Sequence, residues 1–334
     1  MQKLLIEQTQ KLNKAEKSKK FGKKEKYTLE KVRDIYELPF LELLFNAQSV
    51  HRLYQPLNSV QKCILSNIKS GNCPEDCKYC PQSSRYNTDI EKYKLLSKNE
   101  ILMQAKAAKE NGATRFCMGA AWRNAPDNKD FEDILELVSE VKSIGMEACC
   151  TLGMLTQEQA CRLKEAGLTA YNHNLDTSEN FYKEIISTRT YQDRLQTIQY
   201  VSDAGIQVCC GGIVGLGESK NDRIELIKTL ANLEPQPESV PINVLMKIKG
   251  TPLEGLEDID PFELVRSIAT SRIFLPKSKV RLSAGRLNMS HELQALCFLA
   301  GANSIFIGEK LLTTNNPELE NDNILFEKLK LIPL

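Results

Sequence analysis

Three cysteines, Cys73, Cys77 and Cys80, stand within eight residues of one another. Thiolates are soft ligands that select iron–sulfur clusters, zinc or copper. Zinc sites usually combine one C-x2-C pair with a second pair of Cys or His further along the chain, whereas this C-x3-C-x2-C run stands alone between Gly71 and Pro81. Three thiols leave one iron of a four-iron cluster without a protein ligand. The spacing therefore favours a cluster with one iron open to chemistry.

The elements that must position this run follow a repeated unit, in which an amphipathic helical segment ends at a glycine and a short β-rich run follows. The unit recurs at Gly112, Gly145, Gly167, Gly205 and Gly301. Further strand candidates near 60–68, 240–247 and 280–283 bring the number to eight, separated by helical segments. We therefore predict an α/β fold, a TIM-type (β/α)8 barrel, with a doubly wound parallel sheet as the alternative. In either fold the Cys73 run follows the first strand, at the end where reactive groups gather.

Length and composition indicate a globular protein. The chain has 334 residues, of which 42% are hydrophobic and 26% charged, and no apolar stretch approaches the roughly 18 residues that a bilayer span needs. Eleven cysteines without an export signal favour the reducing cytoplasm over a disulfide framework. Neither a membrane nor a nucleic acid is expected as a partner.

The N-terminal end divides into a tail and two helices. Residues 1–26 hold nine Lys and three Glu, which predicts a solvated, disordered tail and leaves contact with nucleic acid or anionic lipid as the alternative. Thr28 can cap a first helix. A second helix, to about residue 51, has an apolar stripe made of Leu41, Leu44, Phe45 and Val50. We expect both helices to cap a single domain that spans residues 27–334.

Alternation along the predicted strands indicates a second constellation. In a barrel strand, alternate side chains point to the lumen and to the surrounding helices. The apolar set Phe116, Met118, Ala148, Cys150, Leu152, Val208, Cys210, Val280 and Leu282 would face the helices. The alternation then predicts that the remaining side chains face the lumen; they are Cys117, Cys149, Cys209, Arg115 and Arg281. Buried polar groups are costly unless they bind something, which points to a second metal centre, although each cysteine taken singly could be a packing residue. The packing interpretation is kept for Cys63, Cys150, Cys161, Cys210 and Cys297.

The longer string GNCPEDCKYCPQSSRY, residues 71–86, closely resembles the biotin synthase family of the radical S-adenosylmethionine superfamily, and the resemblance runs from about residue 27 to 329. It implies a 4Fe-4S cluster on Cys73, Cys77 and Cys80 whose open iron binds S-adenosylmethionine and cleaves it to a 5'-deoxyadenosyl radical. It also implies an auxiliary 2Fe-2S cluster as the sulfur donor. That cluster would be held by Cys117, Cys149, Cys209 and Arg281, the residues that the alternation selects. The implied reaction is the insertion of sulfur into dethiobiotin to form biotin.

The resemblance also implies contacts with small molecules. The cofactor-binding set is Tyr79, Asp176, Arg189, Gly212, Ile213 and Gly215, and the substrate-binding pair is Asn174 and Asn243. Asp176 would accept hydrogen bonds from ribose hydroxyls, and Arg189 would pair with the cofactor carboxylate. The glycines would let the backbone approach a ligand closely.

Further partners implied by the family are a flavodoxin or ferredoxin-type electron donor, iron–sulfur assembly proteins and a second copy of the chain in a homodimer. One rival is another sulfur-inserting radical enzyme such as lipoyl synthase, whose auxiliary cluster is held by an N-terminal Cys group. Residues 1–62 contain no cysteine, which argues against it. A rival of a different class is a zinc-binding structural or nucleic-acid module, which would explain the cysteine run and the basic tail together.

Overall fold

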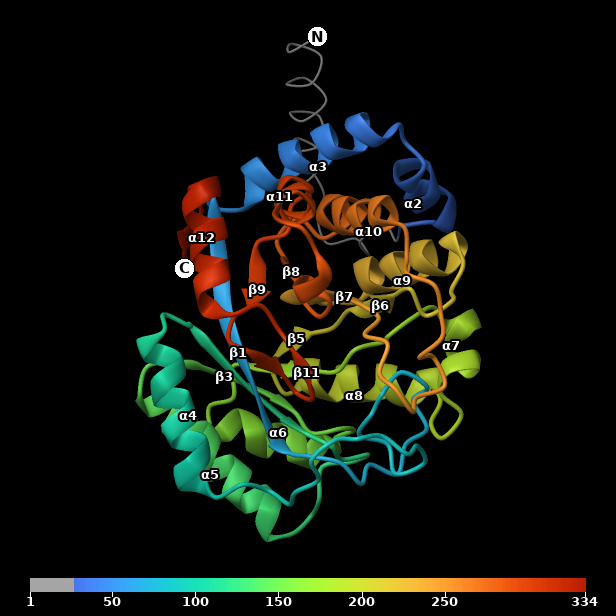
Figure 1. Ribbon diagram of the computed structural model, residues 1–334. Helices are drawn as coiled ribbons and strands as arrows, with labels where there is room; N and C mark the ends of the chain where they lie inside the picture. Colours follow the sequence, from blue (N-terminus) through green and yellow to red (C-terminus); the bar gives the residue numbers. More distant parts are fainter. Residues whose placement is uncertain (1–26) are drawn as a thin grey trace, which may run out of the picture.

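The computed structural model describes residues 27–334, and within them the chain forms a closed parallel barrel (Figure 1). Its eight strands are β1 (Ser59–Lys69), β2 (Arg115–Ala120), β3 (Glu147–Thr151), β4 (Ala170–Asn172), β5 (Gln207–Cys209), β7 (Ser239–Val244), β8 (Lys279–Leu282) and β9 (Ser304–Phe306). Neighbouring strands pair in parallel, and β1 pairs with β9. This last pairing closes the sheet, which confirms the barrel and excludes the doubly wound alternative. The expected tail at 1–26 lies outside the described residues.

Helices surround the barrel (Figure 1). They are α4 (Lys98–Glu110), α5 (Lys129–Ser143), α6 (Gln157–Glu165), α7 (Glu179–Ile185), α8 (Tyr191–Asp203), α9 (Lys220–Asn232), α10 (Pro261–Phe274), α11 (His291–Leu299) and α12 (Leu319–Leu329). Local chemistry sets their ends. Ser97 caps α4 in a capping box with Glu100, which satisfies orphan amides of the first turn. Gly167, after α6, has φ +96°, a left-handed geometry that Gly adopts at little cost.

Two helices precede the barrel, as predicted, and pack on its outer layer. α2 (Leu29–Tyr36) begins after its cap Thr28 and contacts α9 and α10, and α3 (Phe40–Tyr54) packs along α10. The predicted apolar stripe of α3 is wrong in part, because Leu41 is 76% exposed and Phe45 54% exposed. The buried face of α3 is instead made by Leu43, Leu44, Ala47 and His51.

Four short strands were not predicted. β6 (Gly212–Val214) continues β5 after a break and pairs with β7, and β12 (Ile332–Pro333) pairs with the start of β1. β10 (Lys310–Leu311) and β11 (Thr314–Asn315) form an antiparallel hairpin. Leu311 of this hairpin packs among the side chains of the barrel interior. A 3-10 turn, η1 (Arg286–Asn288), follows β8.

The alternation of the strands is confirmed by how the apolar side chains cluster. Phe116, Met118, Ala148, Cys150, Leu152, Val208, Cys210, Val280 and Leu282 belong to the large core between sheet and helices. A second, smaller cluster fills the lumen and contains Cys63, Cys117, Cys149, Ala170, Phe306 and Leu311. The face assignment therefore holds for the adjacent pair Cys149 and Cys150. None of the helices within residues 27–334 is both long and apolar enough to cross a bilayer.

Candidate active site

The cysteine loop, residues 71–84, folds back on itself directly after β1. The Cys73 amide donates to the Gln82 carbonyl at 3.0 Å, and the Ser84 amide donates to the Cys73 carbonyl at 2.7 Å. The Cys80 amide donates to the Cys77 carbonyl at 2.9 Å. These bonds hold the three thiols on one short turn at the C-terminal end of the barrel, where the sequence places them.

Two acidic residues inside the loop tie it to the segment that follows α7. The Asp76 carboxylate accepts hydrogen bonds from the amides of Ser187, at 2.9 Å, and Thr188, at 3.2 Å. Glu75 is buried, accepts a bond from the Thr188 hydroxyl and lies 3.3 Å from Arg123. Because both carboxylates are used for anchoring, we interpret them as supports of the loop rather than as metal ligands.

The thiols of the loop stand in a setting that suits a bound iron–sulfur cluster. Burial raises the pKa of Cys73 and of Cys77, and it raises the pKa of Cys80 to about 12. Thiols so buried stay protonated unless a metal takes the place of the proton. No group of three or more His, Cys, Asp and Glu side chains in residues 27–334 is already arranged as a metal site. The donor set nevertheless fits: three soft sulfurs on one turn, with no His among them.

A hydrogen-bonded network stands beside the thiols. The Tyr79 hydroxyl donates to Asp176 Oδ2 at 2.7 Å, and the buried Arg194 guanidinium donates to the same oxygen. Arg194 also donates to the Asn174 carbonyl at 2.6 Å and to the Tyr182 hydroxyl at 2.8 Å. Asp176 has φ +67°, a strained left-handed backbone that Asp tolerates better than most residues. The network therefore fixes one carboxylate at the cavity wall.

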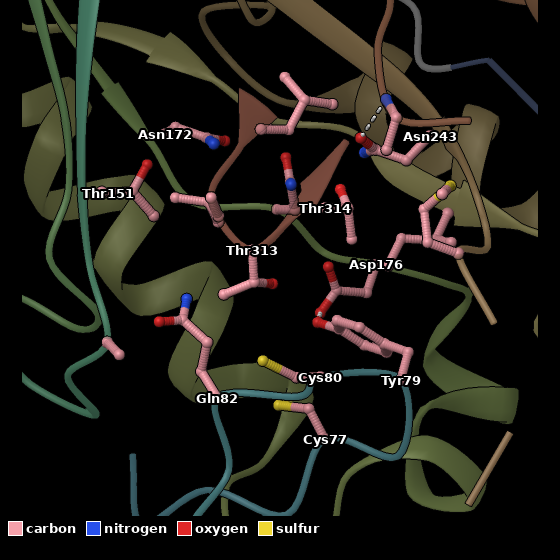
Figure 2. A pocket seen from close by; sticks show the side chains of 18 of the residues that line it. Cys77, Tyr79, Cys80, Gln82, Thr151, Asn172, Asp176, Asn243, Thr313 and Thr314 are labelled. Atoms are coloured by element: carbon pink, nitrogen blue, oxygen red, sulfur yellow. Dashed lines mark hydrogen bonds between the residues drawn. The ribbon is translucent and has the colours of Figure 1, made fainter. Parts of the chain in front are cut away.

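One cavity of about 310 Å³ connects the cysteine loop with the interior of the barrel. Its lining includes all three loop thiols at one end and Arg281, Ser283 and Phe306 at the other. Figure 2 shows the sulfurs of Cys77 and Cys80 side by side at one end, with Tyr79 meeting Asp176 beside them. In the same view Thr313 and Thr314, from the β10–β11 hairpin, lie between the thiols and Asn172. A volume of this order is typical of small-molecule sites.

Polar groups of the cavity differ in whether they already have a partner. Asn174 accepts a hydrogen bond from the Gly211 amide at 3.0 Å, and Asn243 donates to the Gly212 carbonyl, also at 3.0 Å. Asn172 Oδ1 and Arg189 Nε are buried, line the same cavity and have no hydrogen-bond partner, although Arg189 Nε lies 3.9 Å from the Glu75 carboxylate. Arg189 does approach Cys77, with Nη2 3.7 Å from the sulfur. Buried polar atoms without partners are rare, so these two point to a polar ligand.

The glycine-rich segment after β5 behaves differently from its predicted role. Among the three positions singled out in it, Ile213 lines the cavity, whereas Gly212 and Gly215 are not part of the lining. A Cβ added to Gly212 would lie 2.7 Å from the Asp176 carbonyl oxygen and 2.3 Å from Leu226 Cδ2. The glycine is needed there because protein atoms, rather than a ligand, approach closely.

The thiols of Cys117, Cys149 and Cys209, here called the lumen thiols, lie one layer beneath the cavity. Gly119 and Thr151 line the cavity, and Cys117 and Cys149 are the preceding inward residues of the same strands. Cys117 and Cys149 face each other in register. The neighbouring Cys149 side chain, together with burial, raises the pKa of Cys117 well above its ordinary value. The structure therefore places these two thiols side by side on neighbouring strands.

Arg281 joins the cavity to the lumen thiols. Its Nη1 lies 3.8 Å from Cys209 Sγ, its Nε donates to Ser304 Oγ at 2.9 Å, and its guanidinium stacks 4.7 Å from the ring centre of Phe306. Among the described residues no carboxylate forms an ion pair with Arg281, although the side chain is buried. Burial acts to lower the pKa of Arg281, but the surrounding thiols outweigh it and the pKa is raised. A buried cation with sulfur neighbours fits an anionic guest such as a thiolate-bound cluster.

Arg115, the other predicted inward arginine, has a different role. Its Nε donates to Glu147 at 2.7 Å and its Nη1 to Glu238 at 3.0 Å. Both acids stand at the N-terminal ends of barrel strands. The charge of Arg115 is thus neutralised by two protein carboxylates, and these ion pairs lie at the N-terminal end of the barrel interior.

Sequence reasoning missed two residues of this region. Cys63, for which the sequence analysis kept a packing interpretation, belongs to the lumen cluster, and its sulfur lies 3.3 Å from Arg281 Nη2. The alternation that selected the other cysteines also places Gln61, Cys63 and Leu65 inward, so the signal was present on β1. Arg194 was missed because it stands on α8, where no local pattern separates it from other helix charges.

Comparison with known proteins identifies two family signatures in the chain. Residues 67–230 match the Radical SAM superfamily, and residues 241–332 match the Biotin and Thiamin Synthesis associated domain. The boundary between them falls inside one barrel, because β2 to β5 lie in the first range, β8 and β9 lie in the second, and β7 joins β5 to β8 in one continuous sheet.

Individual relatives are similar over nearly the whole chain. Biotin synthase of Hahella chejuensis is 62% identical over 307 residues, covering 92% of this chain and 86% of the relative. Biotin synthase of Synechococcus sp. is 61% identical over 306 residues, covering 92% and 99%. Among solved structures, methylornithine synthase has a TM-score of 0.78 at 19% identity, with 93% of this chain and 95% of that chain covered. The FeFe-hydrogenase maturase of Carboxydothermus hydrogenoformans also scores 0.78 at 19% identity, with 99% and 80% covered. At such identities the structural likeness concerns the fold.

Proposed function

The chain belongs to the biotin synthase family of radical SAM sulfurtransferases, and on that premise we propose that two sets of its side chains divide the conversion of dethiobiotin to biotin. One set, Cys73, Cys77 and Cys80, holds the 4Fe-4S cluster. The other, Cys117, Cys149, Cys209 and Arg281, holds the sulfur donor. The observation that carries the proposal is the single cavity that has the first set in its wall and Arg281 at its inner end.

The residues around the cysteine loop would bind S-adenosylmethionine. A reduced cluster at such a site supplies one electron to S-adenosylmethionine, which opens the radical chemistry that unactivated C–H bonds require. Arg189 presents a buried guanidinium nitrogen without a hydrogen-bond partner, which suits the carboxylate of the amino-acid part. Asp176 is held rigidly by Tyr79 and Arg194 and would accept hydrogen bonds from ribose hydroxyls. Ile213 supplies an apolar wall beside it.

The amides deeper in the cavity would hold dethiobiotin, whose cyclic urea offers both N–H donors and a carbonyl acceptor. Asn174 and Asn243 are fixed by their bonds to the backbone, so their remaining hydrogen-bonding capacity points in set directions. We add Asn172, whose unpartnered Oδ1 would otherwise cost about 1–3 kcal/mol. Such positioning lowers the barrier by orienting the reacting carbon.

The lumen thiols and Arg281 would hold the 2Fe-2S sulfur donor directly beneath the substrate. The three sulfurs are buried, and Arg281, which lies 3.8 Å from the Cys209 sulfur, lines the cavity. A site so enclosed excludes water and other molecules that would quench a carbon radical. Gly212 would act indirectly, by letting the backbone pack closely against Asp176, and Gly215 by adopting a left-handed backbone with φ +89°.

An anaerobic assay tests the proposal: the reconstituted protein is given dethiobiotin, S-adenosylmethionine and a reductant, and biotin is measured. Iron, sulfide and zinc analysis of the same sample distinguishes the rival class. We expect about six iron and about six sulfide per chain, from one four-iron and one two-iron cluster. Stoichiometric zinc without sulfide would instead support a structural zinc module.

Other expectations accompany this proposal. The electron would come from a reduced flavodoxin or ferredoxin-type protein, the clusters from iron–sulfur assembly proteins, and the enzyme would work as a homodimer. All eleven cysteines are free in the described part of the chain, which supports action in the reducing cytoplasm. We further propose that residues 27–334 act as one domain.

A further inference from the structure

Cys63 is a fourth thiol in the lumen, outside the ligand set proposed above. It is fully buried on β1, two residues before Leu65, which faces Cys117 across the strand pair. On its other side β1 pairs Cys63 with Phe306. Cys63 therefore lies inside the barrel together with the lumen thiols. The other buried cysteines outside the ligand sets belong to the core between sheet and helices; they are Cys150, Cys210 and Cys297.

The guanidinium of Arg281 lies between Cys63 and Cys209. Its Nη2 is 3.3 Å from Cys63 Sγ, and its Nη1 is 3.8 Å from Cys209 Sγ. The sulfur that Arg281 approaches more closely is thus the one outside the proposed ligand set. Cys63 Sγ has one further polar neighbour, Ser304 Oγ at 3.8 Å. The Cys63 sulfur consequently lies directly beside the guanidinium whose place as a ligand it would take.

The two side chains differ strongly as iron ligands. A guanidinium has no lone pair to donate until it loses a proton, and its pKa lies above about 12. A thiol loses its proton at about 8.5 in water and is a soft ligand well suited to iron–sulfur clusters. A two-iron cluster on three cysteines needs one more ligand, so the lumen offers one strong and one weak donor for the same position.

We propose that Cys63 is a reserve ligand of the second cluster, able to occupy the fourth position when Arg281 does not. In the exchange the bond from iron to the deprotonated guanidine of Arg281 would break and a bond from iron to the Cys63 sulfur would form. The thiol proton would pass to the released guanidine, 3.3 Å away, and no electron would be transferred. The inference rests on the proposed function, because it takes the lumen thiols as cluster ligands. It gives this chain a four-cysteine site beside the three-cysteine and arginine site.

The test compares Arg281→Met with the double variant Cys63→Ala/Arg281→Met. Each full-length protein is reconstituted anaerobically with iron and sulfide, and the two-iron cluster is quantified by Mössbauer spectroscopy, which separates it from the four-iron cluster. We expect Arg281→Met to keep about two cluster irons per chain with a spectrum of four sulfur ligands, and the double variant to lose at least about three quarters of them. The matched control Cys150→Ala/Arg281→Met removes a buried thiol from the opposite face and should keep the cluster.

Two results would overturn the inference. One is a two-iron cluster of the same amount and spectrum in Arg281→Met and in the Cys63 double variant. The other is loss of that cluster from Arg281→Met although Cys63 is present and circular dichroism shows a folded barrel. A parent protein that binds the four-iron cluster but no second cluster would refute the proposed function itself, so the two failures are distinguishable.

Discussion

The adjacent cysteines Cys149 and Cys150 provide the sharpest test of the face assignment, because one residue step in a strand reverses the direction of the side chain. Cys149 faces the lumen and is paired in register with Cys117, whereas Cys150 is buried in the core between sheet and helices. The perturbation is the replacement of each cysteine singly by Ala. The two variants have the same composition and differ only in the face from which sulfur is removed.

Stability alone does not separate the two variants. Both thiols are at most 1% exposed, so each replacement removes one buried sulfur and leaves a small cavity that costs about 1–2 kcal/mol of unfolding free energy. Urea unfolding of the metal-free proteins should therefore show similar losses. This result serves as the control, since it shows that both variants fold and are perturbed alike.

The cluster content does separate them. Cys149→Ala removes one of four proposed ligands, and we expect about two of about six irons per chain to be lost after anaerobic reconstitution. Cys150→Ala should keep all of them. Cys209→Ala and Cys210→Ala repeat the comparison on β5. If Cys150→Ala lost the two-iron cluster while Cys149→Ala kept it, the face assignment and the proposed sulfur-donor site would both be wrong.

Three further predictions concern pH, cofactor binding and backbone packing. Burial and neighbouring positive charges lower the pKa of His51 to about 4, below its value in the unfolded chain. The free energy of unfolding should therefore be highest above about pH 6.5 and should fall by about 1–2 kcal/mol on acidification to about pH 5. In urea unfolding, His51→Gln should make this decrease smaller. Tyr79→Phe removes the 2.7 Å bond to Asp176 and should weaken S-adenosylmethionine binding in equilibrium dialysis about tenfold, with iron content unchanged; unchanged affinity would contradict the assigned support role. Gly212→Ala places a Cβ 2.7 Å from the Asp176 carbonyl oxygen and should cost about 1–3 kcal/mol in thermal unfolding, whereas Gly255→Ala, with nothing within 4 Å, should be neutral.

The barrel could be predicted because its signals are local and repeated. Five of the described helix-to-strand connections contain a glycine at positive φ, among them Gly145 and Gly205, and each strand carries its own alternation. The prediction of which face of α3 is buried was wrong in part because that choice is not set locally. Leu41 and Phe45 have a helical spacing that fits a buried face, but the face that is buried depends on how α3 lies against α10, and that is a tertiary choice.

The parts of the site that could be predicted are those whose position follows from local sequence spacing. Cys73, Cys77 and Cys80 are on one turn, and the inward cysteines follow from strand alternation. The contributions of Arg194 and of the β10–β11 hairpin could not be predicted in this way. Arg194 reaches Asp176 from a helix, across 18 residues of sequence, and the hairpin brings Thr313 and Thr314 into a cavity made by strands far from it in the chain.

Arg115 and Arg281 show why alternation can find a site without assigning roles inside it. Both arginines are inward, both are about 1% exposed, and nothing in their immediate sequence separates a ligand from a structural ion. The difference lies in what the fold brings to them: Glu147 and Glu238 meet Arg115, and only sulfurs, a hydroxyl and an aromatic ring meet Arg281. A buried guanidinium without a carboxylate is costly unless oxygen acceptors or another negative charge compensate it, and within the described residues the oxygen acceptor of Arg281 is Ser304 Oγ alone. In this lumen the available source is the thiolates and the cluster that they would hold, so the charge of Arg281 and the binding of the cluster depend on each other.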